Sequence, residues 1–194
     1  MSWQIPASKF ARRSEELLRK ASPPFLVNHS LRCFHWAVAL AERDEVRFDA
    51  ELLYVAATLH DLGLTPEFDS GRCFEDDSAE AAMRLAARWR WPRDRCDGLG
   101  RAIRLHMAEE VEPGDGPEAY LLWQAAALDV SGYRFGDLSA ETVQAVVADH
   151  PRLDFKVGFT RLFENQARRG LGCRVEAFMA GGLAERIAAA PFAS

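Results

Sequence analysis

The sequence predicts an all-α fold in a single domain. Apolar residues recur at helical spacing along most of the chain, and proline or glycine separates the periodic segments. No run of alternating β-branched residues is long enough to predict a strand, and no internal repeat is present. With 194 residues, 48% of them hydrophobic, the chain can form one well-packed core but is short for two.

The first three helices are predicted from their apolar faces and their end signals. The first lies between Pro6 and the pair Pro23–Pro24, and the third starts at Asp49 as the N-cap and ends at Gly63. The second is apolar on two faces, which places it at the centre of the fold. These faces are formed by Val27, Leu31, Phe34, Val38 and Ala41, and by His29, Cys33, Trp36 and Leu40.

A loop over Thr65–Asp76 follows, and it is long for a simple connection, which hints at a functional role. Asp77 and Glu80 form a predicted capping box that starts the next helix, and Pro92 limits that helix. Five further helices are predicted at Asp94–Glu110, Pro117–Val130, Ser139–Asp149, Asp154–Gln166 and Val175–Ala189.

Charge and composition restrict the partners. The net charge is −5 and the basic doublets are isolated, so we expect a small-molecule substrate and no nucleic acid. The longest apolar run, Leu52–Leu59, is far below the roughly 20 residues of a membrane span, and no signal peptide is evident. We therefore expect no membrane partner and a cytoplasmic location. The oligomeric state stays open, self-association included.

The four cysteines contain no Cys-x-x-Cys pair, and a chain of this size and composition does not need covalent links for stability. We therefore expect all four to be reduced thiols.

Polar residues interrupt the predicted apolar faces at four places. His29 lies on an apolar face of the second helix, and His60-Asp61 ends the apolar third helix. His106 ends another apolar stripe, and Asp129 follows an alanine-rich one. An unpaired buried carboxylate is costly unless a cation or strong donors stabilise it. A lone histidine is more often an ordinary core residue and a lone aspartate a helix cap, but together the four sites predict one bound cation.

Two imidazoles and two carboxylates form a mixed nitrogen and oxygen donor set, which suits one divalent transition metal such as zinc, iron, manganese, cobalt or nickel. Such a metal lowers the pKa of bound water toward about 7 and supports hydration or hydrolysis. The spacing of His35 and the helix-end position of His150 exclude both from this set, and we expect them to be structural or exposed.

The order of these residues resembles the HD-domain superfamily of metal-dependent phosphohydrolases and their relatives, and further segments resemble its cyanamide hydratase-like branch. The similarity extends over nearly the whole chain. Its segments are Ile5-Pro6, NHSLR at 28–32, ELLYVA at 51–56, LHDLGLT at 59–65, FEDDSA at 74–79, AIRLH at 102–106, Pro151-Arg152, Phe155-Lys156 and Pro191-Phe192.

The resemblance implies a role for each site residue. It implies a single HD domain over residues 1–194, with a metal-site core at about 25–131, an N-terminal helix within 1–24 and C-terminal helices within 139–194 that pack on the core. The implied metal ligands are His29, His60, Asp61 and Asp129. The implied catalytic residues are Asp61, His106 and Glu75, with His106 a proton shuttle, an outer donor or a ligand of a second metal. The implied substrate contacts are Asn28, Arg32 and Phe74. The chain departs from the branch at Met107, Ser78 and Cys73, where threonine, glycine and a basic residue are usual.

Three functions follow from these observations. The leading one is a metal-dependent hydratase or hydrolase in which metal-bound water or hydroxide attacks a small, cyanamide- or nitrile-like substrate, in a pocket for which Trp36, Tyr54 and Phe74 are the aromatic candidates. The alternative is a phosphohydrolase acting on a nucleotide or other phosphomonoester, which would need cations at the phosphate. The candidate cations are Arg32, Arg72, Arg104 and Lys156. The third is a non-catalytic HD binding module, which the complete ligand set disfavours.

Overall fold

The fold is all-α, as the sequence predicts. The computed structural model describes residues 4–192, and over this range it contains ten α-helices and no strand. The α-helices are α1 Lys9–Ala21, α2 Pro24–Arg43, α3 Ala50–Leu59, α4 Phe74–Arg88, α5 Arg93–Leu105, α6 Pro117–Ser131, α7 Ala140–Asp149, α8 Phe155–Ala167, α9 Arg174–Ala180 and α10 Leu183–Ala189. Three short 3₁₀ helices lie at Leu62–Leu64 (η1), Pro113–Asp115 (η2) and Phe135–Asp137 (η3).

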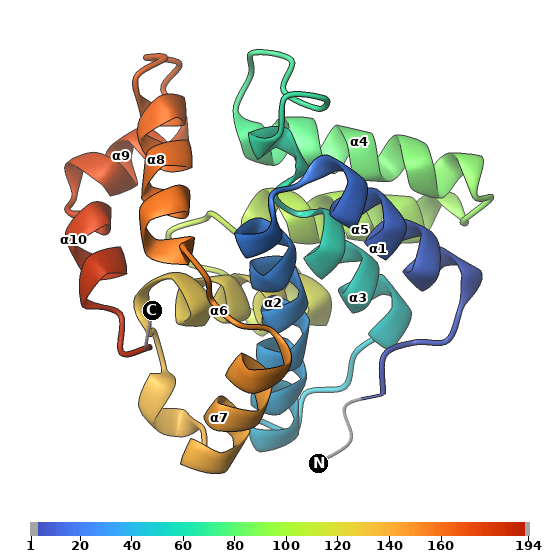
Figure 1. The fold of residues 1–194 in the computed structure, drawn as a ribbon. Coiled ribbons are helices and arrows are strands. Elements are labelled where there is room, and N and C mark those ends of the chain that lie inside the picture. Colours follow the sequence, from blue (N-terminus) through green and yellow to red (C-terminus); the bar gives the residue numbers. More distant parts are fainter. Residues whose placement is uncertain (1–3, 193–194) are drawn as a thin grey trace.

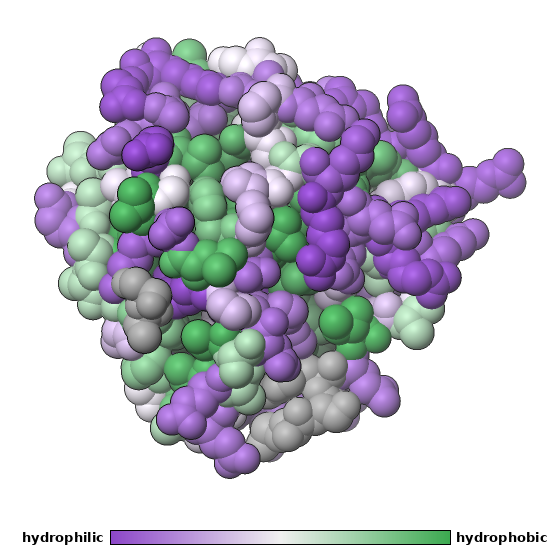
Figure 2. Space-filling model, viewed as in Figure 1, coloured by the Kyte–Doolittle hydropathy of each residue, from purple (hydrophilic) through white to green (hydrophobic). Residues whose placement is uncertain are grey.

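Helix α2 is central, which its two apolar faces predict. It packs against α3 and α6 and also contacts α7 and α8. In Figure 1, α8, α9 and α10 form a separate layer that faces α4 and α5 across the body of the molecule. A larger apolar core surrounds α2, α3, α5 and α6, and a smaller one surrounds Phe155, Phe159 and Phe163 of α8. On the face shown in Figure 2, hydrophilic residues cover the edges and apolar ones are visible between them.

The predicted start of α3 is confirmed. The side chain of Asp49 accepts a hydrogen bond from the backbone N–H of Leu52, as expected of the N-cap of α3. Helix α3 ends at Leu59, however, and the predicted stop Gly63 lies within η1, where its missing side chain lets the backbone of Phe74 approach closely. This close approach joins η1 directly to the start of α4.

Three further predicted boundaries are wrong. Helix α4 starts at Phe74 and not at Asp77, because Asp77 instead accepts hydrogen bonds from Ser70 and closes the preceding loop. Helix α5 ends at Leu105, five residues before the predicted Glu110. The predicted helix at Val175–Ala189 is two helices, because Gly182 has a φ of +81°, which is incompatible with a continuous α-helix.

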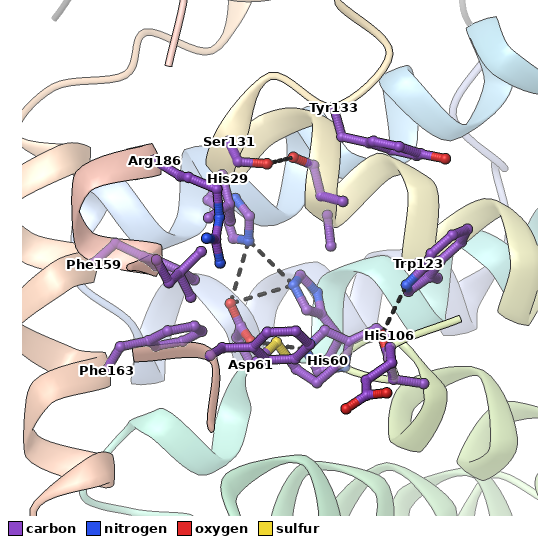
Figure 3. A pocket seen from close by; sticks show the side chains of 18 residues that line it. His29, His60, Asp61, His106, Trp123, Ser131, Tyr133, Phe159, Phe163 and Arg186 are labelled. Atoms are coloured by element: carbon purple, nitrogen blue, oxygen red, sulfur yellow. Dashed lines mark hydrogen bonds and ion pairs between the residues drawn. The ribbon is translucent and has the colours of Figure 1, made fainter. Parts of the chain in front are cut away.

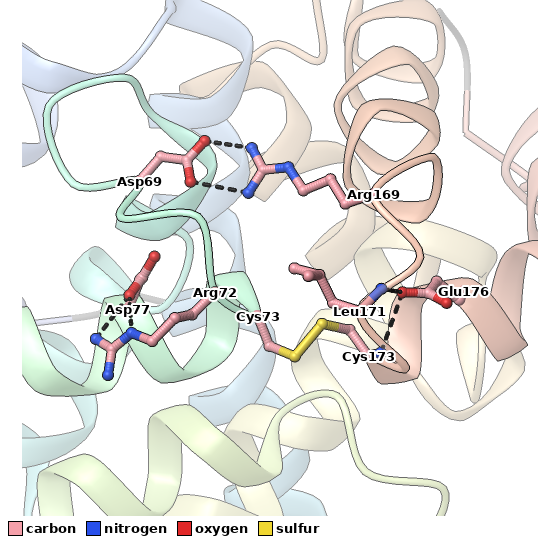
Figure 4. The surroundings of a disulfide bond; sticks show 8 residues. All are labelled: Asp69, Arg72, Cys73, Asp77, Arg169, Leu171, Cys173 and Glu176. Atoms are coloured by element: carbon pink, nitrogen blue, oxygen red, sulfur yellow. Dashed lines mark hydrogen bonds and ion pairs between the residues drawn. A yellow bond between two sulfur atoms is a disulfide. The ribbon is translucent and has the colours of Figure 1, made fainter.

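The expectation of four reduced thiols is also wrong. Cys73, before α4, and Cys173, before α9, form a disulfide across a sequence separation of 100 residues (Figure 4). The neighbouring ion pair of Asp69 and Arg169 joins the same two loops. Spacing alone does not show which distant cysteines meet, so this pair could not be predicted from the sequence. The disulfide removes one observation behind the expected cytoplasmic location, since such bonds persist mainly in oxidising compartments. Cys33 and Cys96 are buried free thiols.

None of the described helices is both long enough and apolar enough to cross a membrane.

We predict that reduction of the Cys73–Cys173 bond lowers the free energy of unfolding by about 2–5 kcal/mol, because the bond restricts the unfolded chain. The measurement is chemical denaturation of the oxidised protein and of a Cys73→Ser/Cys173→Ser variant. The double variant itself, measured with and without reductant, is the control for effects of reductant on the rest of the protein. Equal stability of the oxidised protein and the double variant would contradict the prediction.

Candidate metal centre

Four side chains from three helices meet at one buried point, as Figure 3 shows. His29 lies in the first half of α2, His60 and Asp61 directly follow α3, and His106 directly follows α5. The Nε2 atoms of His29 and His60 are 3.2 Å apart, and Oδ2 of Asp61 lies 3.3 Å from each of them. Nε2 of His106 is 3.6 Å from Oδ1 of Asp61. The structure thus brings these four predicted site residues together.

The Nδ1 contacts determine which nitrogen of each ring faces the cluster. His60 Nδ1 is 2.8 Å from the carbonyl of Ala57, and His106 Nδ1 is 2.5 Å from the carbonyl of Ile103. Because a carbonyl only accepts, these nitrogens carry the hydrogen and donate it. In the neutral rings, each Nε2 therefore directs a lone pair toward the centre of the cluster.

Helix termini produce this arrangement at two of the ligands. His60 and His106 each occupy the position just after a helix, with helical backbone angles, and each contacts the carbonyl three residues earlier. A side chain at such a position donates to one of the unsatisfied carbonyls of the last turn. The same hydrogen bond orients the ring, so one contact both caps the helix and directs Nε2 toward the cluster.

Asp61 supplies the negative charge of the cluster. Both of its carboxylate oxygens are buried, and neither has a hydrogen-bond partner among the described residues. Burial disfavours this charge, so the carboxylate is costly there unless a cation lies beside it. Burial also lowers the pKa of His60, which favours the neutral ring.

The donor set therefore fits a divalent transition metal. Imidazole lone pairs that face one another and a buried carboxylate without donors are unfavourable unless a cation lies between them. Ligand atoms of His60, Asp61 and His106 lie within 4.8 Å of one another, and so do those of His29, Cys33 and His60. Three nitrogens and one carboxylate suit zinc, iron, manganese, cobalt or nickel better than magnesium or calcium.

Asp129 lies behind His29 and not beside the other predicted ligands. Its Oδ2 accepts from Nδ1 of His29 at 2.8 Å and from Arg32, and its Oδ1 accepts from Arg32 and from the indole N–H of Trp36. Arg152 adds a contact of 3.3 Å to Oδ1. Asp129 and both arginines are buried, and these cations hold the pKa of the Asp129 carboxyl well below its usual range despite its burial. In this position Asp129 orients His29, as carboxylates commonly do for metal-bound histidines.

The residues predicted to contact the substrate instead contact other parts of the protein. Arg32 binds Asp129 and the backbone carbonyl of His150, and Asn28 donates to the carbonyl of Pro151, so both hold the connection between α7 and α8. Phe74 is buried and packs its ring against that of His106. Glu75 is buried on α4, and its Oε2 has no hydrogen-bond partner among residues 4–192.

A cavity of about 330 Å³ opens from the cluster and is mainly apolar. Its walls come from the segment after α5, from α6 and the residues after it, and from α8 to α10. The lining residues besides the cluster are Met107, Ala108, Glu109, Trp123, Ala126, Ala127, Val130, Ser131, Tyr133, Phe159, Phe163, Phe178, Leu183 and Arg186. The aromatic candidates of the sequence, Trp36, Tyr54 and Phe74, do not line it.

The C-terminal helices contribute a wall of this cavity that the sequence did not predict. Phe155, Phe159 and Phe163 recur every four residues, a spacing that indicates one apolar helix face but does not distinguish core from pocket wall. No sequence pattern around Arg186 indicates that it lines a cavity.

The cations expected at a phosphate site are engaged elsewhere. Arg72 pairs with Asp77 and Glu80, and Arg104 with Asp76. Lys156 donates to the carbonyls of Ala188, in the last turn of α10, and of Ala190, directly after this helix.

Comparison with known families agrees with this site. The family model of the HD domain matches residues 26–149, which is more than half of the chain and includes His29, His60, Asp61, His106 and Asp129. The chain therefore belongs to the HD domain family, whose members are of the metal-dependent hydrolase type. None of the curated proteins matches it. The cyanamide hydratase-like branch stays a prediction.

We predict that Asp129→Ala lowers the free energy of unfolding by about 3–5 kcal/mol, because it leaves Arg32 and Arg152 buried without a counter-charge. Asp76→Ala is the matched control, since it removes an exposed ion pair with Arg104 and should cost less than about 1 kcal/mol. Urea denaturation of the two variants checks this. Equal effects in both would contradict the assigned role of Asp129.

Proposed function

We propose that this protein is a metal-dependent hydratase or hydrolase that adds water to a small substrate, with a cyanamide- or nitrile-like group as the reacting part. The observation that carries the proposal is the position of the donor cluster, which closes one end of a mainly apolar cavity. A site of this kind brings a substrate into contact with a metal while excluding most water, which strengthens electrostatic interactions.

The proposed ligands are His29, His60 and Asp61, with His106 in the place that the sequence assigned to Asp129. A divalent metal held there would lower the pKa of a coordinated water and polarise the substrate atom under attack. Asp129 fixes the orientation of His29 through its Nδ1, and the carbonyls of Ala57 and Ile103 do the same for His60 and His106. The protein thus keeps the donor atoms in place before the substrate enters.

His106 has a second proposed role. If another group coordinates the metal in its place, His106 is the residue that transfers a proton. It lines the cavity, and its ring is supported by Phe74 and by the ring of His60. Its Nε2 is the atom that faces the cluster, so a proton would enter or leave there. Glu75 has no proposed contact with the substrate, because it does not line the cavity.

The phosphohydrolase alternative is less well supported. Phosphate ester hydrolysis needs cations around the phosphate oxygens, and the four cations that the sequence offered are all bound elsewhere. Arg186 is the single arginine or lysine among the described residues that line the cavity.

We predict that the purified protein holds about one transition metal per chain, and that His60→Ala and Asp61→Ala remove it because each deletes a donor of the cluster. Elemental analysis after dialysis is the measurement. His150→Gln, which changes a histidine outside the cavity, is the matched control and should retain the metal. Wild-type protein that stays metal-free after supplementation would refute the site.

We also predict that metal-loaded protein hydrates cyanamide to urea and that His60→Ala lowers this rate at least about a hundredfold, since metal catalysis supplies several kcal/mol. Urea release is measured beside phosphate release from a panel of nucleotides. Hydrolysis of the nucleotides alone would favour the phosphohydrolase, and activity on neither with metal bound would favour the non-catalytic module.

A further inference from the structure

The cavity is larger than a cyanamide-like group. Its volume is about 330 Å³, whereas one water molecule occupies about 30 Å³ in the liquid. A group of three heavy atoms at the metal cluster would therefore leave most of the cavity empty. The remaining space lies between the wall formed by α8 and the wall that contains Trp123 and Tyr133 (Figure 3).

The two walls present aromatic rings rather than polar groups. Phe159 and Phe163 line one side, with ring centroids 4.3 Å apart. Trp123 and Tyr133 line the other, with centroids 5.8 Å apart. The indole N–H of Trp123 donates to the carbonyl of Ala108, so its polar atom is already satisfied. Such walls favour a flat apolar body.

Few polar groups line the rest of the cavity, and the hydroxyl among them already has a hydrogen-bond partner. The hydroxyl of Ser131 donates to the carbonyl of Ala127. Glu109 belongs to the segment after His106 and so to the side of Trp123, which contacts the adjacent Ala108. A negatively charged group would therefore be placed away from that side.

Arg186 is the exception on the opposite side. It extends from α10 toward the cavity near His29 and Phe159 (Figure 3). One nitrogen, Nη1, donates to the carbonyl of Gly181 at 2.7 Å, and no carboxylate of the described residues pairs with the guanidinium. Arg32 and Arg152, by contrast, both contact the buried carboxylate of Asp129. The guanidinium of Arg186 thus offers N–H donors and a full positive charge to whatever enters the cavity.

We propose that the substrate carries, besides its reacting group, a flat apolar body that lies between these aromatic walls and an anionic group, such as a carboxylate, that Arg186 binds. Arg186 is then a specificity-determining residue. This inference rests on the proposed function only for the position of the reacting group. The net charge of −5 does not oppose it, because salt screens distant charges beyond about 8 Å while Arg186 acts by direct contact.

The test compares two ligands of nearly equal shape, 4-cyanobenzoate and 4-cyanobenzamide, by calorimetric titration of the metal-loaded full-length protein. We expect the wild type to bind the carboxylate at least about tenfold more tightly, since a hydrogen bond to a charged group is stronger than one to a neutral amide. Arg186→Gln should abolish this preference and Arg186→Lys should keep part of it. Arg174→Gln is the matched control, because Arg174 is also exposed and also donates to a backbone carbonyl, that of Arg104, outside the cavity.

A third ligand, cyanoacetate, tests the aromatic walls. It has the anionic group but no ring, so it should bind at least about tenfold more weakly than 4-cyanobenzoate. Phe163→Ala should weaken 4-cyanobenzoate and leave cyanoacetate nearly unchanged.

Three results would overturn the proposal: equal binding of the carboxylate and the amide, equal binding of the two anions, or a preference for the carboxylate that persists in Arg186→Gln. The last would place the carboxylate on the metal. All these measurements report binding, and metal content is measured separately. A protein that binds as expected but turns nothing over would therefore refute the proposed function and not this inference.

Discussion

The buried contact between Asp129 and two arginines is the constraint on which the rest of the structure depends. Arg32 of α2 and Arg152 of the α7–α8 connection both bind one carboxylate of α6, so three parts of the chain meet at a single charge. The same carboxylate orients His29. A charge at this depth is costly when it has no partner, so Asp129 links the position of the α7–α8 connection to the direction of the His29 ring.

The fold and much of the site could be predicted because they depend on local patterns. Apolar spacing and terminal residues such as Asp49 determine the helices, and the placement of His60-Asp61 and His106 at the ends of apolar stripes indicates a shared centre. The cost of burying such groups without a cation is a general property, so it can be read without coordinates.

The features that escaped prediction depend on contacts between distant segments. Asp129 lies on the expected face of α6, but the direction of its carboxylate is decided by Arg32 and Arg152, which no periodicity reveals. The second wall of the cavity requires α8 to pack on α2, and its phenylalanines have the same spacing whether they face a core or a pocket. Likewise, Cys73 and Cys173 lie too far apart in sequence for their spacing to carry information.

The disulfide determines which peptide cleavages would separate the residues of the site. The bond closes a ring of residues 73–173, which contains His106, Asp129 and the walls formed by α6 and α8, whereas His29, His60 and Asp61 lie outside it. A single peptide cleavage anywhere inside the ring, for example in the exposed residues around Gly114, therefore leaves both halves of the site on one covalent molecule. A cleavage between α2 and α3 has the opposite effect, because it detaches His29 from every other ligand and leaves only packing to hold it.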